Sequence, residues 1–140
     1  MLVRGIRGAT TVEANTVEAI LEATKELLAA MLKANETDVE YVASAFFTTT
    51  LDLNAEFPAL VARDIVGTNV ALMCGHEMNK PGALPMCLRI LLHVNTEKRA
   101  DEIQAPLDPS LYTTLQRMAT SGDYRLVVSL GGGALPGLAG

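Results

Sequence analysis

The chain has 140 residues, of which 49% are hydrophobic, 19% charged and 4% aromatic, so it can bury one aliphatic core and is too apolar to remain unfolded. Sixteen Asp and Glu against eleven Lys and Arg give a net charge of −5, which leaves no broad basic surface for a nucleic-acid backbone. The sequence shows neither the apolar core of a secretory signal nor an apolar run of about 18 residues. We expect a cytoplasmic protein with reduced cysteines that binds neither nucleic acid nor membrane.

The first half of the chain predicts a strand, a helix and a second strand. Residues 2–8 alternate like a short strand and carry an arginine on each face. Over residues 17–32, apolar side chains recur at the spacing of one helix face, and Asn15 is the expected N-cap. Residues 41–50 are rich in aromatic and β-branched side chains and predict a strand that runs into a threonine-rich turn at 48–50.

The second half predicts a short helix and two further strands. The helix begins at Phe57-Pro58 and ends at Gly67, since proline suits a helix start and glycine a helix end. Apolar runs at 69–74 and 86–96 predict strands separated by a loop rich in glycine and proline. This order of elements favours an α/β or α+β domain whose helices cover one face of a mixed sheet.

An arginine within the apolar run 86–96 is the clearest sign of a binding site. Arg89 alternates with four aliphatic residues that share the opposite strand face, namely Leu88, Ile90, Leu92 and Val94. A buried guanidinium needs an anionic partner because it does not lose its proton. Two interpretations remain open: a snorkelling or internally paired side chain, for example with Glu77, or a recess for an anionic ligand.

A second strand arginine, Arg7, favours the ligand interpretation. Gly5 and Gly8 flank it and would let a ligand approach the backbone closely. Two strand arginines in an acidic protein suit a dicarboxylate. Arg63, on the short helix, is by itself an ordinary solvated charge.

The remaining polar residues do not form a known catalytic motif. The sequence contains no nucleophile elbow, P-loop, dinucleotide-binding glycine motif or zinc-protease helix. His76 and His93 have no partner at a recognisable spacing, and Cys74 and Cys87 are interpreted as small buried thiols rather than zinc ligands. Glu77 follows a strand end, where both a solvated glutamate and a site residue are plausible. Residues alone thus predict a pocket for a small anion.

Four sequence blocks, MLVRGIRGATTVE, FPALVARDIVG, MCGHEM and CLRILLHVNT, together resemble the monofunctional AroH-type chorismate mutases. The blocks have the family's order and nearly its spacings, from residue 1 to about 104. The resemblance implies a pseudo-α/β-barrel-like fold and a homotrimer with active sites between neighbouring subunits. It also implies the Claisen rearrangement of chorismate to prephenate, in phenylalanine and tyrosine biosynthesis, without a cofactor or metal.

The resemblance also assigns residues to the site. Arg89 would contact a substrate carboxylate and the ether oxygen, and Arg7 would hold a carboxylate. Glu77 and Cys74 would meet the ring hydroxyl and the charge that develops on the ring. The other implied substrate contacts are Phe57 and Arg63, which come from the adjacent subunit, together with Ala59, Met73, Gly75 and His76.

The resemblance ends after Gln104. Where the family has a strand with a substrate-contacting tyrosine, this chain has Leu107, and no matching C-terminal turn follows. Tyr112 or Arg117 could substitute from a displaced segment, and an altered reading frame is another explanation that resequencing would test. We therefore expect a domain core at 1–104 and a divergent, partly disordered segment at 105–140. A Rid-type imine deaminase and a non-catalytic carboxylate-binding trimer are the alternative functions.

Overall fold

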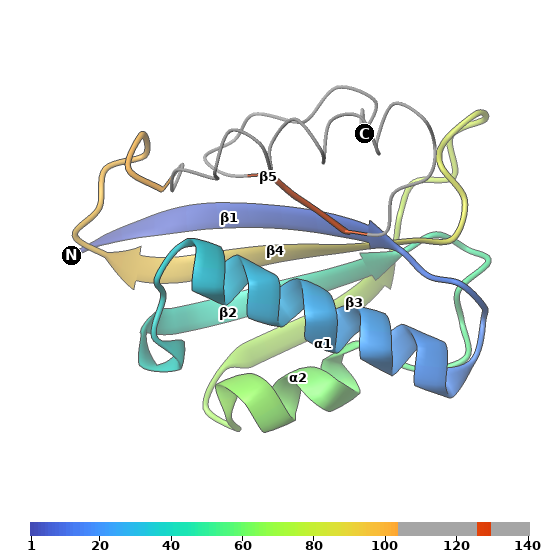
Figure 1. The fold of residues 1–140 in the computed structure, drawn as a ribbon, viewed down its shortest axis with the longest axis horizontal. Helices are drawn as coiled ribbons and strands as arrows, with labels where there is room; N and C mark the ends of the chain where they lie inside the picture. The colour runs from blue at the N-terminus through green and yellow to red at the C-terminus, as the bar shows by residue number, and fades with distance from the viewer. Residues whose placement is uncertain (104–125, 130–140) are drawn as a thin grey trace.

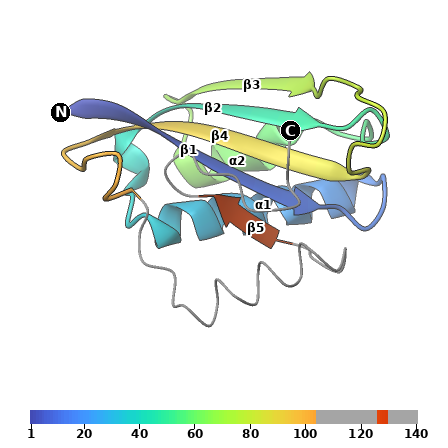
Figure 2. The same ribbon diagram turned by 90° about the horizontal axis from the view of Figure 1, so that it is seen from above.

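The computed structural model describes residues 1–103 and 126–129 (Figure 1). Five strands form one sheet in the order β3-β2-β4-β1-β5, which Figure 2 shows from top to bottom. Among the described strand pairs, only β2–β3 is parallel. In chain order the elements are β1 (Leu2–Thr11), α1 (Val17–Ala34), the 3₁₀ helix η1 (Val39–Tyr41), β2 (Val42–Thr49), α2 (Ala59–Val66), β3 (Ala71–His76), β4 (Cys87–Thr96) and β5 (Leu126–Ser129).

Both helices lie on the same face of the sheet, so the predicted mixed sheet with helices on one face is confirmed. Helix α1 packs across β1 and β4, and α2 packs beside α1 and β3. The four aliphatic side chains on one face of β4, at 88, 90, 92 and 94, point into this layer and are at most 1% exposed. Neither described helix is long and apolar enough to cross a membrane.

The start of α1 differs from the prediction by one residue. Thr16 is the N-cap, and its hydroxyl accepts a hydrogen bond from the Ala19 amide at 3.2 Å. The prediction that Asn15 caps this helix is wrong, because the side-chain oxygen of Asn15 bonds the loop before α2 and not the helix. It accepts hydrogen bonds from the amides of Asn54 and Ala55, each at 3.0 Å, and thereby ties the helix start to the loop before α2.

Gly8 serves helix packing, contrary to the prediction that it admits a ligand. A Cβ atom at this position would lie 2.6 Å from Met31 Sδ and 2.9 Å from Leu27 Cδ1, so α1 approaches β1 too closely for a side chain. Gly5 lies on the opposite face, where a Cβ atom would be 3.7 Å from Leu91 Cδ1. Of the two glycines, only Gly5 lies on the face that no described helix covers.

That second face, called here the open face, carries both apolar and charged side chains. The register places Phe46 of β2 beside Met73 of β3 on one side and Leu91 of β4 on the other, and Arg7 of β1 follows Leu91 in the same row. Phe46 is 37% exposed and Met73 is 61% exposed. The open face therefore presents an apolar surface next to an arginine.

Strand β3 is displaced by two residues from the predicted 69–74. Its parallel pairing with β2 continues to Thr49 and His76, and the Glu77 amide then donates to the Thr49 carbonyl at 2.8 Å. This pairing brings Glu77 to the end of β2. In the predicted divergent segment the structure describes β5, which pairs with the free edge of β1. The rest of the predicted segment, including Leu107, Tyr112 and Arg117, lies outside the described residues.

The contrast between the two glycines predicts a difference in stability. Gly8→Ala should lower the free energy of unfolding by about 1–3 kcal/mol, because the methyl group overpacks buried side chains of α1. Gly5→Ala, the matched control, should change it by less than about 0.5 kcal/mol. Urea unfolding at one fixed protein concentration measures both. Equal midpoints for the two variants would contradict the packing role of Gly8.

Candidate functional site

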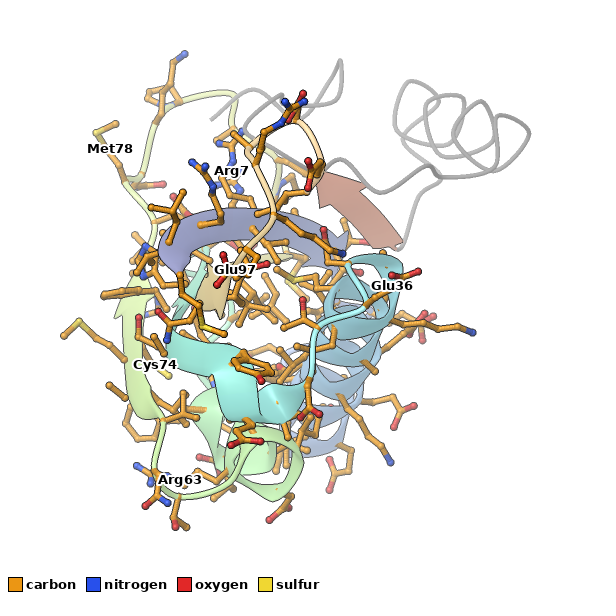
Figure 3. All side chains as sticks on the ribbon, turned by 90° about the vertical axis from the view of Figure 1, so that its left-hand side faces the viewer. Arg7, Glu36, Arg63, Cys74, Met78 and Glu97 are labelled. Carbon is orange, nitrogen blue, oxygen red and sulfur yellow. The ribbon has the colours of Figure 1, made fainter. Side chains whose placement is uncertain are left out.

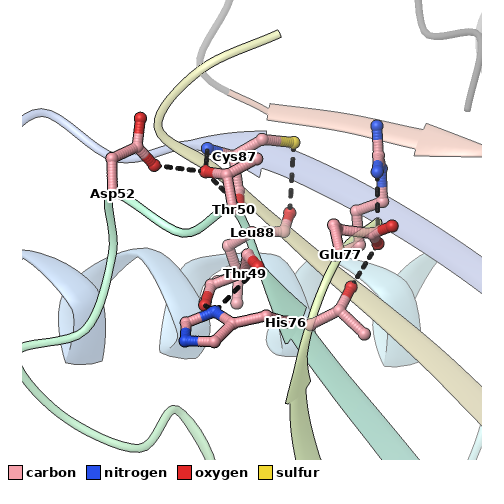
Figure 4. Close-up of polar contacts among 9 residues, drawn as sticks. Thr49, Thr50, Asp52, His76, Glu77, Cys87 and Leu88 are labelled. Carbon is pink, nitrogen blue, oxygen red and sulfur yellow. Dashed lines mark hydrogen bonds and ion pairs between the residues drawn. The ribbon is translucent and has the colours of Figure 1, made fainter. Parts of the chain in front are cut away.

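An ion pair forms the centre of the candidate site. Arg89 Nη1 lies 3.1 Å from Glu77 Oε1, and the two side chains are 21% and 26% exposed. The hydroxyl of Thr48 donates to the same oxygen of Glu77 at 2.5 Å (Figure 4). Thr48 and Arg89 are register partners on β2 and β4, so both reach Glu77 from adjacent strands. The internal pairing of Arg89 is confirmed, and the pair remains partly open to solvent.

The environment of Glu77 keeps this carboxylate charged. Burial raises its pKa, but the hydrogen bond from Thr48 and the hydrogen bond and positive charge of Arg89 together outweigh burial. The net effect is a pKa below the ordinary value of 4.5. At neutral pH the pair therefore consists of a fixed guanidinium and a fixed carboxylate.

Arg7 lies on the same face as this pair. It is exposed on β1 and faces Leu91, while Ala9, two residues along β1, faces Arg89. Alternation along β1 places Arg7 and Ala9 on the same side of the sheet. The structure thus brings two of the predicted site arginines onto adjacent strands of the open face.

A second group of predicted site residues surrounds a cavity of about 320 Å³ at the edge strand β3. Phe57, Cys74, Gly75 and His76 line it, and Phe57 is 70% exposed. The ring of His76 is held at the sheet, with Nδ1 3.1 Å from the Thr49 hydroxyl oxygen. The cavity has the mixed apolar and polar lining that is typical of small-ligand sites.

Cys74 connects this cavity to helix α2. Burial raises the pKa of its thiol above 9.0, and a backbone hydrogen bond with Ala59, at the start of α2, offsets part of that effect. The thiol is therefore protonated at neutral pH, so it acts as a weak donor and not as a nucleophile. The contact also places Ala59 near Cys74. Arg63 is exposed further along α2.

The Glu77–Arg89 pair and the residues that line the cavity at β3 lie on opposite sides of the sheet. In the β2–β3 pairing, Cys74 aligns with the core residue Phe47, whereas Thr48 and Arg89 point to the open face. Met73 points to the open face, although it is the neighbour of Cys74 in the sequence. Figure 3 shows Arg7 beside β1 and well away from Arg63, which lies on α2. One chain therefore does not gather all the predicted residues around a single point.

Thr48 and two residues near it were not predicted as part of the site. Asp52 accepts hydrogen bonds from the Thr50 hydroxyl at 2.5 Å and from the Met86 amide at 2.9 Å. Thr50 in turn accepts from the Cys87 amide at 3.0 Å. The hydrogen bond from Thr50 is the main cause that lowers the pKa of Asp52. The sequence signal for this network is the threonine run at 48–50, which by itself predicts only a turn.

The histidine and cysteine outside these groups have structural roles. His93 Nδ1 lies 2.9 Å from the Ser44 hydroxyl, and its ring packs edge-to-face on Phe46 with centroids 5.8 Å apart. Cys87 is fully buried and unpaired, as predicted for a small buried thiol. Within residues 1–103, no cluster of three His, Cys, Asp or Glu side chains could hold a metal ion.

This arrangement defines an α+β protein whose candidate site presents a guanidinium and a carboxylate in fixed positions. Comparison with known proteins assigns its family. Residues 3–108 match the family described as chorismate mutase type I. The chain is 42% identical to chorismate mutase AroH of Bacillus subtilis (strain 168) over 105 residues, which are 74% of this chain and 83% of the relative. It is 46% identical to chorismate mutase AroH of Thermus thermophilus over 104 residues, 74% of this chain and 85% of the relative.

A solved structure agrees with these relatives. The structure of a chorismate mutase from Clostridium thermocellum matches with a TM-score of 0.69 and 44% identity, over 71% of this chain and 89% of that one. The chain therefore belongs to the type I chorismate mutase family. This assignment does not favour the imine deaminase alternative.

The lowered pKa of Glu77 predicts how stability depends on pH. A carboxyl group with a lowered pKa in the folded state stabilises the fold fully above its unfolded value, near 4.5, and this contribution is lost as the pH falls through the folded value. The free energy of unfolding should therefore fall less steeply with acidification in Glu77→Gln than in the wild type. Denaturant titrations between pH 6 and about 3 measure this slope. Glu40→Gln, at an exposed position, controls for the loss of one charge, and equal slopes in the two variants would contradict the prediction.

Proposed function

We propose that this chain rearranges chorismate to prephenate, in the biosynthesis of phenylalanine and tyrosine, at a site that contains the Glu77–Arg89 pair. The observation that carries this proposal is a preorganised arginine on an open sheet face in a member of the type I chorismate mutase family. The two AroH relatives and the solved neighbour carry the same activity in their names.

The chemistry of the rearrangement matches these residues. One concerted step breaks a C–O bond and forms a C–C bond, and it requires no nucleophile, proton transfer or cofactor. Negative charge grows on the ether oxygen and positive charge on the ring. A guanidinium held beside the ether oxygen stabilises this separation without reorganising, because Glu77 already fixes it.

The other residues of the open face bind and orient the substrate. Arg7 suits a substrate carboxylate, since a guanidinium pairs with carboxylates through two parallel hydrogen bonds. The carboxylate of Glu77 suits the ring hydroxyl and the positive charge that develops on the ring. Holding chorismate in its compact reactive conformer accelerates the reaction by removing unproductive freedom.

We further propose that the active form is a homotrimer with each site between two subunits. Phe57 and Arg63 would complete the site from the neighbouring chain, and the further substrate contacts would be Ala59, Met73, Cys74, Gly75 and His76. Two observations support this assembly: the two groups face opposite sides of one chain, and the open face exposes Phe46 and Met73. Large exposed apolar patches mark interaction surfaces.

The compartment and domain boundaries are part of the same proposal. The cytoplasm suits the two free thiols, Cys74 and Cys87, because this compartment keeps thiols reduced. We assign residues 1–104 to the catalytic core and 105–140 to a divergent C-terminal segment. The family match, which ends at residue 108, supports this division.

Arg89→Ala tests the catalytic proposal. The variant should lose about 10²–10³-fold in kcat, as for removal of an oxyanion-hole donor, because the developing charge loses its fixed partner. The loss of chorismate absorbance, with prephenate identified as product, measures turnover. Arg4→Ala is the matched control. Arg4 lies on β1, beside β4, and its side chain bonds the Lys98 carbonyl and not Glu77. Wild-type kcat in Arg89→Ala would remove Arg89 from catalysis.

Subunit mixing tests whether sites lie between chains. Arg89→Ala and Arg63→Ala each disable a different half of the proposed site. Random co-assembly should restore about one quarter of wild-type activity at low chorismate, since that share of sites receives two intact halves. Differently tagged chains, co-expressed and co-purified, provide the mixed trimers. Mixed trimers no more active than either parent would show that each site lies within one chain.

A further inference from the structure

The threonine run at 48–50 joins β2 to both ends of the loop that carries Glu77. At one end Thr48 bonds the Glu77 carboxylate, and Thr49 bonds His76 and the Glu77 amide. At the other end Thr50 accepts from the Cys87 amide, two residues before Arg89. Consecutive threonines therefore bond Glu77 itself, its neighbour His76, and a residue two positions before Arg89.

The contact from Thr48 restricts the Glu77 carboxylate to one orientation. The Thr48 hydroxyl and Arg89 both reach Oε1, and no hydrogen bond among the described residues uses Oε2. The backbone of Glu77 is fixed as well, because its amide extends the β3 pairing to Thr49. Arg89 by itself could pair with either carboxylate oxygen as the group rotates. A second donor from β2 selects one oxygen and leaves the other for a ligand.

We propose that Thr48 is a positioning residue that aims Oε2 of Glu77 at the substrate and holds Arg89 in its reactive orientation. This inference rests on the proposed function and assigns Thr48 a role in the same site. Thr48 need not touch the substrate, since its hydroxyl acts through Glu77. Asp52 and Thr50 support the same loop from its far end, through the amides of Met86 and Cys87.

A purely structural role for Thr48 would have different consequences. The hydroxyl would then contribute to folding, and its loss would lower stability without changing how Glu77 titrates or how fast the bound substrate reacts. Several other groups surround Glu77 and stay unchanged when Thr48 is replaced. They are Arg89 and Cys87 on β4, Asp52 after β2, and His76 and Lys80 on its own segment, while Arg7 lies on the same open face on β1.

The experiment compares Thr48→Val, which removes the hydroxyl and keeps the branched shape, with Thr48→Ser, which keeps the hydroxyl. Thr48→Ala is a second variant without the hydroxyl, in case the valine disturbs the fold. Ser44→Ala is the matched control, because Ser44 is a hydroxyl residue on the same strand and face that bonds His93 instead. Melting curves and light scattering verify that each variant keeps its fold and assembly.

Two readouts are measured on each variant. The first is the pKa of Glu77 in the free protein, from carboxyl carbon NMR with Glu77→Gln for assignment. The second is kcat and KM for chorismate. Thr48→Val should raise the pKa of Glu77 and lower kcat about tenfold, with KM changed less than about threefold, because the lost hydrogen bond orients the charged form. Thr48→Ser should keep both the Glu77 pKa and kcat near their wild-type values, and Ser44→Ala should change neither.

An unchanged Glu77 titration and kcat in the folded variants without the hydroxyl would overturn the proposal. Equal losses in Thr48→Val and Thr48→Ser would overturn it too, since the hydroxyl would then not be the cause. If the wild type consumes no chorismate, the proposed function fails, but the NMR titration still decides whether Thr48 controls Glu77.

Discussion

The position of the candidate site depends on the alternation of β4. This strand lies between β1 and β2, and its aliphatic residues Leu88, Ile90, Leu92 and Val94 are buried against the helices. A shift of the register by one residue would exchange the two faces and bury the Arg89 guanidinium. A buried, unpaired charge costs about 3–5 kcal/mol, comparable to much of the stability of a domain. The apolar core therefore holds Arg89 on the open face, where it pairs with the Glu77 carboxylate that Thr48 bonds.

Elements with a strong local period could be predicted from the sequence. The spacing of apolar residues in α1 and the alternation in β4 are each contained in one segment, and both predictions are confirmed. The pairing of Arg89 with Glu77 is one of two interpretations that the sequence allows, because an arginine in an apolar strand requires an anion. The helix caps and strand ends were less predictable, because tertiary contacts such as that of Asn15 with the loop before α2 decide them.

The residues that sequence analysis missed are those whose role depends on strand order. Thr48 and Glu77 are 29 positions apart, and only the parallel β2–β3 pairing brings them together. The packing role of Gly8 is not visible in the sequence, because the sequence does not show which face of the sheet α1 covers. Met73 and Cys74 are neighbours in sequence but point to opposite sides of β3. A residue list alone therefore does not show that the proposed site has two separate halves.

The pairing of β1 with β4 also has a consequence for how the chain folds. Leu2 aligns with Thr96, so the central strands of the sheet come from the beginning and the end of the first hundred residues. Closing so long a loop costs chain entropy before any pairing energy is gained. During synthesis, β1 and α1 emerge from the ribosome well before β4, and α1 has only part of its sheet to pack on. We expect slow folding completed only after β4 has left the ribosome, so chaperones that shield the apolar face of α1 would raise the yield of native protein.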